Sequence, residues 1–408
     1  MNASPVLLTL DNGLRVLVDT RPDVASGIFG VSTRVGSRDE TPDRHGLAHF
    51  VEHTIFKGTP ALSASRIINH MECIGGELNA FTSKDETVVY SVFAGRELRR
   101  AAGLLGRLIA DSCFPSKEID REREVIRDEI DMYRDTPSEA VNDDFEDLLF
   151  KGSSLGHNIL GTPDSLDAFT SDVCREYLTN YYTPTNMVAF YSGPIGAAEV
   201  EREVRRAFGA MQAHTPVRPV SEVPDAPLFD RRRKADTHQC HIVTGIRVGG
   251  MNDTGRFANA LAANVLAGPG MNSMLNMALR EKRGLVYSVE ASTTLFEDIG
   301  VVAIYYGCDP EDEGRCRRTV RDTIARMADS YGTPRRLERS VRQYLGQLAI
   351  ASDNRENAIF AAARSVLFRG HLLPREHTAE AIRAVSADEF REAASRFMST
   401  STLVLGGA

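Results

Sequence analysis

The chain has 408 residues, 42% hydrophobic and 25% charged, an ordinary globular composition with enough length for two domains of about 200 residues each. The formal net charge is -8 and the one basic run, at residues 231–234, is short, which argues against a nucleic-acid-binding surface. The six cysteines are dispersed and form no C-x-x-C pair, so we expect reduced thiols and neither a disulfide scaffold nor a thiolate zinc site.

Nothing in the sequence indicates a membrane protein. No segment reaches the roughly 18 apolar residues of a membrane span, and the N-terminus lacks the basic and apolar regions of a signal peptide. We therefore expect a cytoplasmic protein with neither a membrane nor a nucleic acid as partner.

The chain opens with signals for β structure. Residues 7–10 and 14–18 flank Asn12-Gly13, a dipeptide that supplies the positive φ angles of a tight turn, so these segments predict a hairpin. Apolar periodicity and capping residues predict further elements in chain order. These are a strand at 28–35, a helix at 46–56, a helix from Ser63 or Ser65 to Gly75, two strands within 77–90, a helix at 97–113 and a long charged helix at 116–134.

A linker divides the sequence into two similar halves. Residues 215–227 carry four prolines and no usable periodicity, so we predict domains at 1–214 and 228–408. The segment 34–39 before the first predicted helix is echoed by 247–252 before a second helix at about 254–267. We infer a duplicated unit, and because the second helix carries no ligand set, only the first copy is expected to hold a metal.

The helix at 46–56 contains the motif His49-Phe50-Val51-Glu52-His53. Two imidazoles four residues apart project from one face of a helix and can chelate one metal ion. Glu52 can then reach a metal-bound water without being a ligand, which is the H-x-x-E-H arrangement of inverted zinc peptidases. The alternative is a histidine pair on a solvated helix face.

A catalytic zinc needs a third protein ligand and one open position for water. Acidic candidates lie on the long helix, where Glu122 and Glu129 are seven residues apart on one face, while Glu124 and Asp128 point elsewhere. Spacing alone leaves the choice open, since any of these acids could be a solvated surface charge.

Together these motifs resemble the inverzincin peptidases of family M16, which include mitochondrial processing peptidase, insulysin and pitrilysin, and most closely their short bacterial subfamily. The resemblance covers nearly the whole chain. It implies an α+β fold of two homologous domains, each a mostly antiparallel sheet packed with helices. It also implies one Zn2+ per chain with His49, His53 and Glu129 as ligands, and Glu122 as an auxiliary acid near the site.

Two further motifs resemble the family's substrate-binding segments. Residues 75–82 are similar to the segment that binds substrate as an added strand, through Asn79 and the backbone of Ala80. In the second half, residues 280–287 are similar to the segment whose arginine and tyrosine, here Arg280 and Tyr287, hold the substrate backbone.

From these features we predict a zinc endopeptidase that hydrolyses extended or unfolded peptides, with Glu52 as general base on the zinc-bound water. Single-chain relatives carry four such domains and this chain has two, so a homodimer with shared active sites is expected. Two alternatives stay open at this stage. One is a non-catalytic subunit of a heterodimeric assembly, and the other is an H-x-x-E-H lyase, although such lyases are much shorter.

Overall fold

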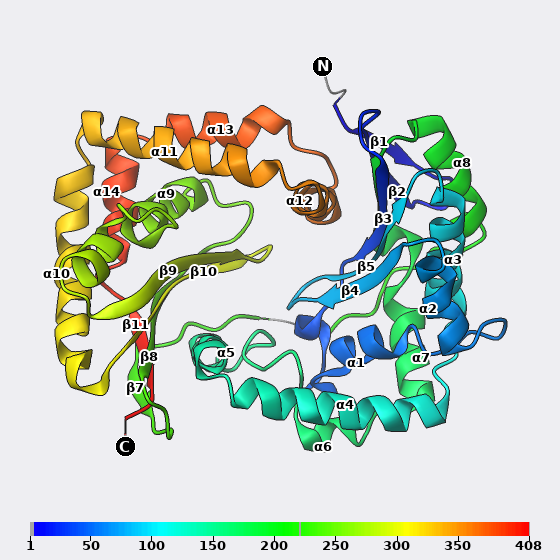
Figure 1. Ribbon diagram of the computed structural model, residues 1–408, viewed down its shortest axis with the longest axis horizontal. Coiled ribbons are helices and arrows are strands. Elements are labelled where there is room, and N and C mark those ends of the chain that lie inside the picture. The colour runs from blue at the N-terminus through cyan, green and yellow to red at the C-terminus, as the bar shows by residue number, and fades with distance from the viewer. Residues whose placement is uncertain (1–3, 220–221, 408) are drawn as a thin grey trace. The chain divides into compact units, whose positions relative to one another are not determined.

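The computed structural model describes residues 4–219 and 222–407. The chain forms two compact units, each built around its own β-sheet (Figure 1). Unit 1 comprises residues 1–131, 152–223 and 352–373, and unit 2 comprises residues 132–151, 224–351 and 374–408. The crossing between residues 223 and 224 falls inside the segment predicted as a linker.

Unit 1 consists of a sheet and the helices around it. Its strands are β1 (Val6–Thr9), β2 (Arg15–Thr20), β3 (Ser26–Thr33), β4 (Glu77–Thr82), β5 (Thr87–Ala94) and β6 (Met187–Gly193). Its helices are α1 (Leu47–Thr54), α2 (Ala64–Glu72), α3 (Leu98–Asp111), most of α4 (Ser116–Arg134), α6 (Pro163–Leu166), α7 (Ser171–Tyr181), α8 (Ala197–Phe208) and α12 (Arg355–Arg369), with short 3-10 turns η1 (Ser37–Asp39), η2 (Pro42–Arg44) and η3 (Pro184–Asn186).

The sheet of unit 1 is mixed, with strand order β1-β2-β6-β3-β5-β4. The predicted hairpin is confirmed: β1 and β2 pair antiparallel from Val6 opposite Val18 to Thr9 opposite Arg15, and Gly13 has a φ of 86° in the turn. Only the β2–β6 pair is parallel among the described strands of this sheet. Among the described strands, β4 lies at an edge of the sheet and pairs with β5 alone.

Both faces of this sheet are buried. One face carries Phe29, Val31 and Val89 into the main core with α1, α3 and α8. The opposite face carries residues such as Ile28 and Phe190, which pack against α12. Figure 1 shows α12 and the pair α3 and α8 on opposite sides of the strands. Burial on both faces explains the nearly continuous apolar sequence of β3, β5 and β6.

Unit 2 repeats the plan. Its strands are β7 (Asp230–Arg233), β8 (Cys240–Gly249), β9 (Val286–Leu295), β10 (Ile299–Cys308) and β11 (Ser401–Leu405). Its helices are α5 (Pro137–Leu149), α9 (Arg256–Ala267), a π-helical segment η4 (Asn276–Glu281), α10 (Glu313–Tyr331), α11 (Pro334–Ser352), α13 (Arg375–Ala384) and α14 (Ala387–Arg396), with the 3-10 turn η5 (Pro310–Asp312).

The topology confirms the predicted duplication. The sheet order β7-β11-β8-β10-β9 matches β2-β6-β3-β5-β4 position by position, and the parallel β2–β6 pair corresponds to the parallel β7–β11 pair. Helix α9 follows β8 as α1 follows β3. The strand predicted at 28–35 lies two residues earlier, at Ser26–Thr33, and the second-half helix begins at Arg256.

The two halves of the sequence exchange a helix. Helix α5, from the first half, packs on β8 and β11 of unit 2, where Phe145 lies over Gly245. Helix α12, from the second half, packs on β3 and β6 of unit 1. Each unit therefore takes one helix from the other half of the sequence. In the part of the chain that is described, no helix combines the length and apolar character needed to cross a membrane.

Candidate metal centre

Helix α1 presents the H-x-x-E-H motif. It starts at Gly46, whose φ of 97° favours glycine, and it buries Leu47, Phe50 and Val51 in the core. This anchoring fixes the face that carries His49 and His53, whose ring centroids lie 4.5 Å apart. A helix of eight residues thus holds both imidazoles side by side, as the four-residue spacing predicts.

Helix α4 supplies the facing carboxylates. Ile119, Ile126 and Ile130 are buried in the core and orient the helix. As a result Glu129 Oε2 lies 3.7 Å from His49 Nε2 and 3.6 Å from His53 Nε2. Glu124 instead is exposed and pairs with Arg127 at 2.5 Å, in agreement with the expectation that it points away from the face of Glu122 and Glu129.

These three side chains fit a metal ion. One ligand atom from each of His49, His53 and Glu129 lies within 4.8 Å of the others. Zinc bonds of about 2.0–2.1 Å in a tetrahedral site place ligand atoms roughly 3.4 Å apart, close to the two nitrogen-to-oxygen distances here. Two imidazoles and one carboxylate are also the donor set of catalytic zinc sites that leave one position open.

The protonation state of His49 is the one that a metal ligand requires. Burial, together with the neighbouring His53, lowers the pKa of His49 to about 3. A neutral imidazole therefore faces Glu129, with a lone pair available for a metal. For His53 burial lowers the pKa, but the hydrogen bond to Glu122 and the charges of Glu52 and Glu129 outweigh it and leave the pKa raised.

Glu52 is half-buried on the same helix and is not part of the ligand cluster. Burial raises the pKa of its carboxyl group, and the charge of Glu129 acts in the same direction. Thr82, at the end of β4, lies close enough to lower that pKa in part by hydrogen bonding. The carboxyl group of Glu52 thus interacts both with members of the metal-ligand cluster and with the edge strand.

Glu122 contacts His53 at Nδ1, the ring nitrogen that faces away from Glu129. Its Oε2 lies 3.3 Å from His53 Nδ1, and its Oε1 forms an ion pair with Lys57 Nζ at 2.7 Å. Burial raises the pKa of Glu122, but the hydrogen bonds with His53 and Lys57 outweigh this and lower it. A carboxylate on the far nitrogen of a ligating histidine fixes its tautomer and ring orientation.

Three polar residues near the motif were not predicted from the sequence. Lys57 lies four residues after His53, a spacing that could have indicated a shared face. Glu40 and His157 form a buried pair beside the start of α1, with His157 Nε2 3.1 Å from Glu40 Oε2. Their separation of 117 residues leaves no local signal. His45, in phase with the motif, instead stacks on His157 with ring centroids 3.6 Å apart.

The predicted substrate-binding residues of the first half lie on the edge strand. Asn79 and Ala80 are in β4, opposite Tyr90 and Val89 of β5. Strand β4 packs against α1, so the edge adjoins the metal-ligand helix within unit 1.

Arg280 and Tyr287 belong to unit 2. Arg280 lies in the last turn of the π-helical segment, and Tyr287 is 85% exposed on the edge strand β9. The guanidinium carbon of Arg280 lies 6.0 Å from the centroid of the Tyr287 ring, so the two side chains adjoin each other as a pair.

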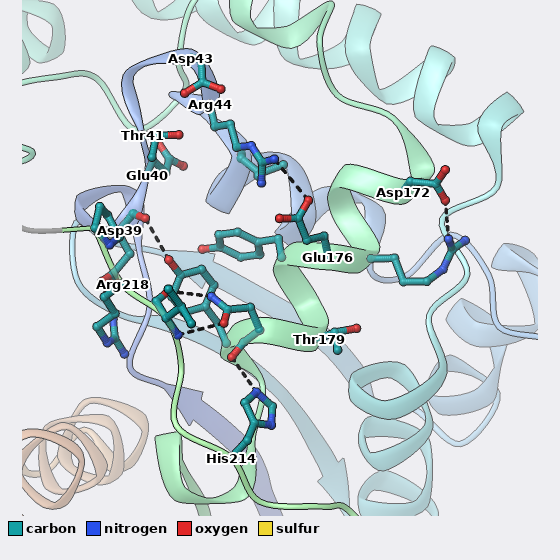
Figure 2. A pocket seen from close by; sticks show the side chains of 17 residues that line it. Asp39, Glu40, Thr41, Asp43, Arg44, Asp172, Glu176, Thr179, His214 and Arg218 are labelled. Carbon is teal, nitrogen blue, oxygen red and sulfur yellow. Dashed lines mark hydrogen bonds and ion pairs between the residues drawn. The ribbon is translucent and has the colours of Figure 1, made fainter.

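A hollow of about 1040 Å³ lies elsewhere in unit 1, lined by residues of α7 and of the segments 39–47 and 214–219 (Figure 2). Charged residues line it, but they pair with one another: Arg44 with Glu176 at 3.2 Å and Arg175 with Asp172 at 2.7 Å. His49, His53 and Glu129 are not among the residues that line this hollow.

Comparison with known proteins gives consistent family matches. The family described as insulinase, peptidase family M16, matches residues 15–163, and the family described as the peptidase M16 inactive domain matches residues 168–344. A protein named as an uncharacterized zinc protease of Streptomyces coelicolor is 33% identical over 396 residues, covering 95% of this chain and 85% of the relative. The uncharacterized zinc protease YmxG of Bacillus subtilis is 32% identical over 362 residues, covering 89% and 88%.

Solved structures show the same fold. A peptidase M16 inactive domain from Pseudomonas fluorescens aligns with a TM-score of 0.90 at 15% identity, covering 100% of this chain and 98% of the other. A protease from Helicobacter pylori also aligns with a TM-score of 0.90, at 18% identity, and covers 100% of both chains. At these identities the likeness concerns the fold alone.

Proposed function

The chain belongs to peptidase family M16 and is a zinc metallopeptidase, and we propose that it is an endopeptidase for extended or unfolded peptides in which Glu52 is the general base. The observation that carries the proposal is the position of Glu129 Oε2, 3.7 Å and 3.6 Å from the Nε2 atoms of His49 and His53. Glu52 lies on the same short helix and is not a member of this cluster, which supports a role as base and not as ligand.

In this proposal His49, His53 and Glu129 hold the zinc ion. A zinc ion held there would supply Lewis-acid chemistry, which lowers the pKa of water and polarises a carbonyl group. Glu52 accepts the proton of the attacking water and then donates it to the leaving amine. Burial raises the pKa of Glu52, which brings it closer to the neutral range in which one group can serve as both base and acid.

Glu122 has a supporting role. Its carboxylate holds His53 Nδ1, which leaves Nε2 directed toward Glu129. Lys57 balances the charge of Glu122 on the side away from the histidine. We assign Glu122 to the orientation of His53 and not to direct proton transfer.

The edge strand β4 is the proposed substrate-binding element. Its free side offers backbone groups to an extended peptide, with Asn79 and Ala80 near its middle. Main-chain pairing of this kind requires an unfolded segment and reads side chains weakly, which supports the preference for extended peptides.

We further propose a homodimer in which Arg280 and Tyr287 of one chain act on peptide bound to the zinc-bearing unit of the other. The support is that the adjoining pair lies in the unit without the ligand cluster. We also propose a cytoplasmic location, which cell fractionation with antibody detection would test.

One experiment tests the ligand assignment and the base assignment independently. Zinc per chain and peptide turnover are measured for wild type, Glu52→Gln and Glu129→Gln. Glu52→Gln should keep zinc and lose turnover, because it removes the base but no ligand, whereas Glu129→Gln should lose both. Loss of zinc in Glu52→Gln with full retention in Glu129→Gln would reverse the assignment.

A further inference from the structure

Helix α1 carries the whole H-x-x-E-H motif but has no cap of its own. It is only eight residues long, and its N-cap is Gly46, which has no side chain to accept a hydrogen bond from the first turn. The backbone N–H groups at the start of a helix need acceptors from elsewhere when they are buried.

Glu40 supplies these acceptors. Its Oε2 accepts a hydrogen bond from Gly46 N at 2.8 Å, and its Oε1 accepts one from Ala48 N at 2.7 Å. The side chain has 0% exposure, and His157 Nε2 lies 3.1 Å from the same Oε2. Figure 2 shows Glu40 beside Asp39 and Thr41 at one side of the hollow.

The partners of Glu40 are themselves fixed. Lys84 Nζ donates to the backbone oxygen of His157, and Lys84 O accepts a hydrogen bond of 2.7 Å from Arg38 N. The turn that contains Lys84 joins β4 to β5. A buried network therefore links the start of α1 to the end of the edge strand on which we place the substrate.

We propose that Glu40 is a positioning residue for the metal centre: by binding two backbone N–H groups of α1 it fixes the rotation and axial position of the helix that presents His49, Glu52 and His53. Ala48 directly precedes the first histidine, so a shift of the first turn moves that imidazole relative to Glu129. This inference rests on the proposed function, because it takes His49, His53 and Glu129 as the ligands.

The test compares Glu40→Gln, Glu40→Asp and the control Glu203→Gln. Glu203 is also buried and ion-paired, to Arg206, but it lies on α8, which packs against α3 and β2. The amide of Glu40→Gln places an NH2 group against a backbone N–H, whereas Glu40→Asp keeps two acceptor oxygens on a shorter side chain. Zinc affinity is measured by competition with a chelator, kcat and KM with a peptide, and the unfolding midpoint without zinc.

We expect Glu40→Gln to bind zinc about 10–100-fold more weakly, the usual loss for a residue that orients metal ligands. Its kcat should fall while KM changes little, and Glu40→Asp should recover part of both losses. Glu203→Gln should lower the unfolding midpoint without changing zinc affinity. If Glu40→Gln does not fold, Glu40→Asp is judged against wild type by the same criteria.

Wild-type zinc affinity and kcat in the Glu40 variants, or equal zinc loss in Glu203→Gln, would overturn the inference. Glu129→Gln in the same assay separates this failure from that of the proposed function. If Glu129→Gln also binds zinc as wild type does, the ligand assignment itself is wrong. If Glu129→Gln loses zinc and the Glu40 variants do not, only the positioning role is rejected.

Discussion

Glu122 Oε2 lies 3.3 Å from His53 Nδ1, so the nitrogen of His53 that faces away from Glu129 is held by a carboxylate. This contact joins α4 to α1 a second time, two helical turns from Glu129. Helix α4 thus contributes both a proposed ligand and the group that orients another ligand.

We expect Glu122→Gln to weaken zinc binding by about 10–100-fold, because the neutral amide holds the imidazole less firmly and lowers its basicity. Isothermal titration with zinc or competition with a chelator measures the change. Glu124→Gln is the matched control, since Glu124 is on the same helix but exposed and paired with Arg127. Equal zinc affinity in Glu122→Gln and Glu124→Gln would remove Glu122 from the site.

Arg364 of α12 should be important for the stability of unit 1. Its guanidinium contacts Glu86 Oε2 at 2.7 Å and Asp85 Oδ2 at 2.9 Å, and both acidic side chains are at most 7% exposed. Removing one partner of a buried ion pair costs about 3–5 kcal/mol, so Arg364→Met should lower the free energy of unfolding by that order. Urea unfolding checks this, and adding Glu86→Gln should recover part of the loss. A double variant no more stable than Arg364→Met would contradict the pairing.

The stability of the zinc-free protein should fall in acid because of His157. Burial, with smaller effects of His45 and Lys84, lowers its pKa from 6.5 to about 3. Between these values the unfolded state binds the proton and the folded state does not, so stability is lost as the pH falls from 6.5 toward 3. The slope from this one group is about 1.4 kcal/mol per pH unit.

We therefore expect the unfolding free energy of His157→Gln to depend less steeply on pH than that of wild type between pH 6 and 4. Urea titrations at several pH values measure both slopes. Above pH 7.5 His157 is neutral in both states, so the slopes should coincide there, which serves as the internal control. Parallel slopes throughout the acid range would show that His157 titrates in the folded protein as it does when unfolded.

Peptide binding to β4 predicts sensitivity to proline. Proline lacks the backbone N–H that pairing with an edge strand uses, so proline next to the cut should raise KM or abolish cleavage. The measurement is a proline scan of one cleaved peptide, read by mass spectrometry, with alanine at the same positions as the control. Indifference to proline at every flanking position would exclude strand pairing.

A shared active site predicts complementation between inactive variants. Glu52→Gln and Arg280→Ala chains are each expected to be nearly inactive, but a mixed dimer joins the intact base of one chain to the intact arginine of the other. Random exchange of subunits should then restore about a quarter of the wild-type sites. The assay is peptide turnover before and after exchange, with exchange itself followed by a mass label. Exchange without recovery would place both groups in one chain.

Local sequence patterns predicted the elements well because they depend on local physics. The spacing of His49 and His53 on a predicted helix requires their proximity, and α1 places their rings 4.5 Å apart. The hairpin at Asn12-Gly13 follows equally from the conformational freedom of its turn. The position of Glu129, and not of Glu122, beside the two Nε2 atoms depends instead on how α4 lies along α1, which spacing does not give.

The network at Glu40 illustrates what the sequence does not contain. Glu40 contacts amides six and eight residues later, and His157 arrives from a distant loop. The exchanged helices are a second case, since the periodicity of α5 or α12 predicts a buried face but not the sheet that covers it.

The exchange of α12 has a consequence for how the protein is made. Ribosomes release the N-terminal strands first, yet the face of β3 and β6 that carries Ile28 and Phe190 is covered by residues 355–369. This apolar face stays without its native cover until nearly all of the 408 residues have been synthesised. A nascent chain that stops at the proline-rich segment would therefore expose a hydrophobic sheet surface, which makes it a substrate for chaperones and for aggregation.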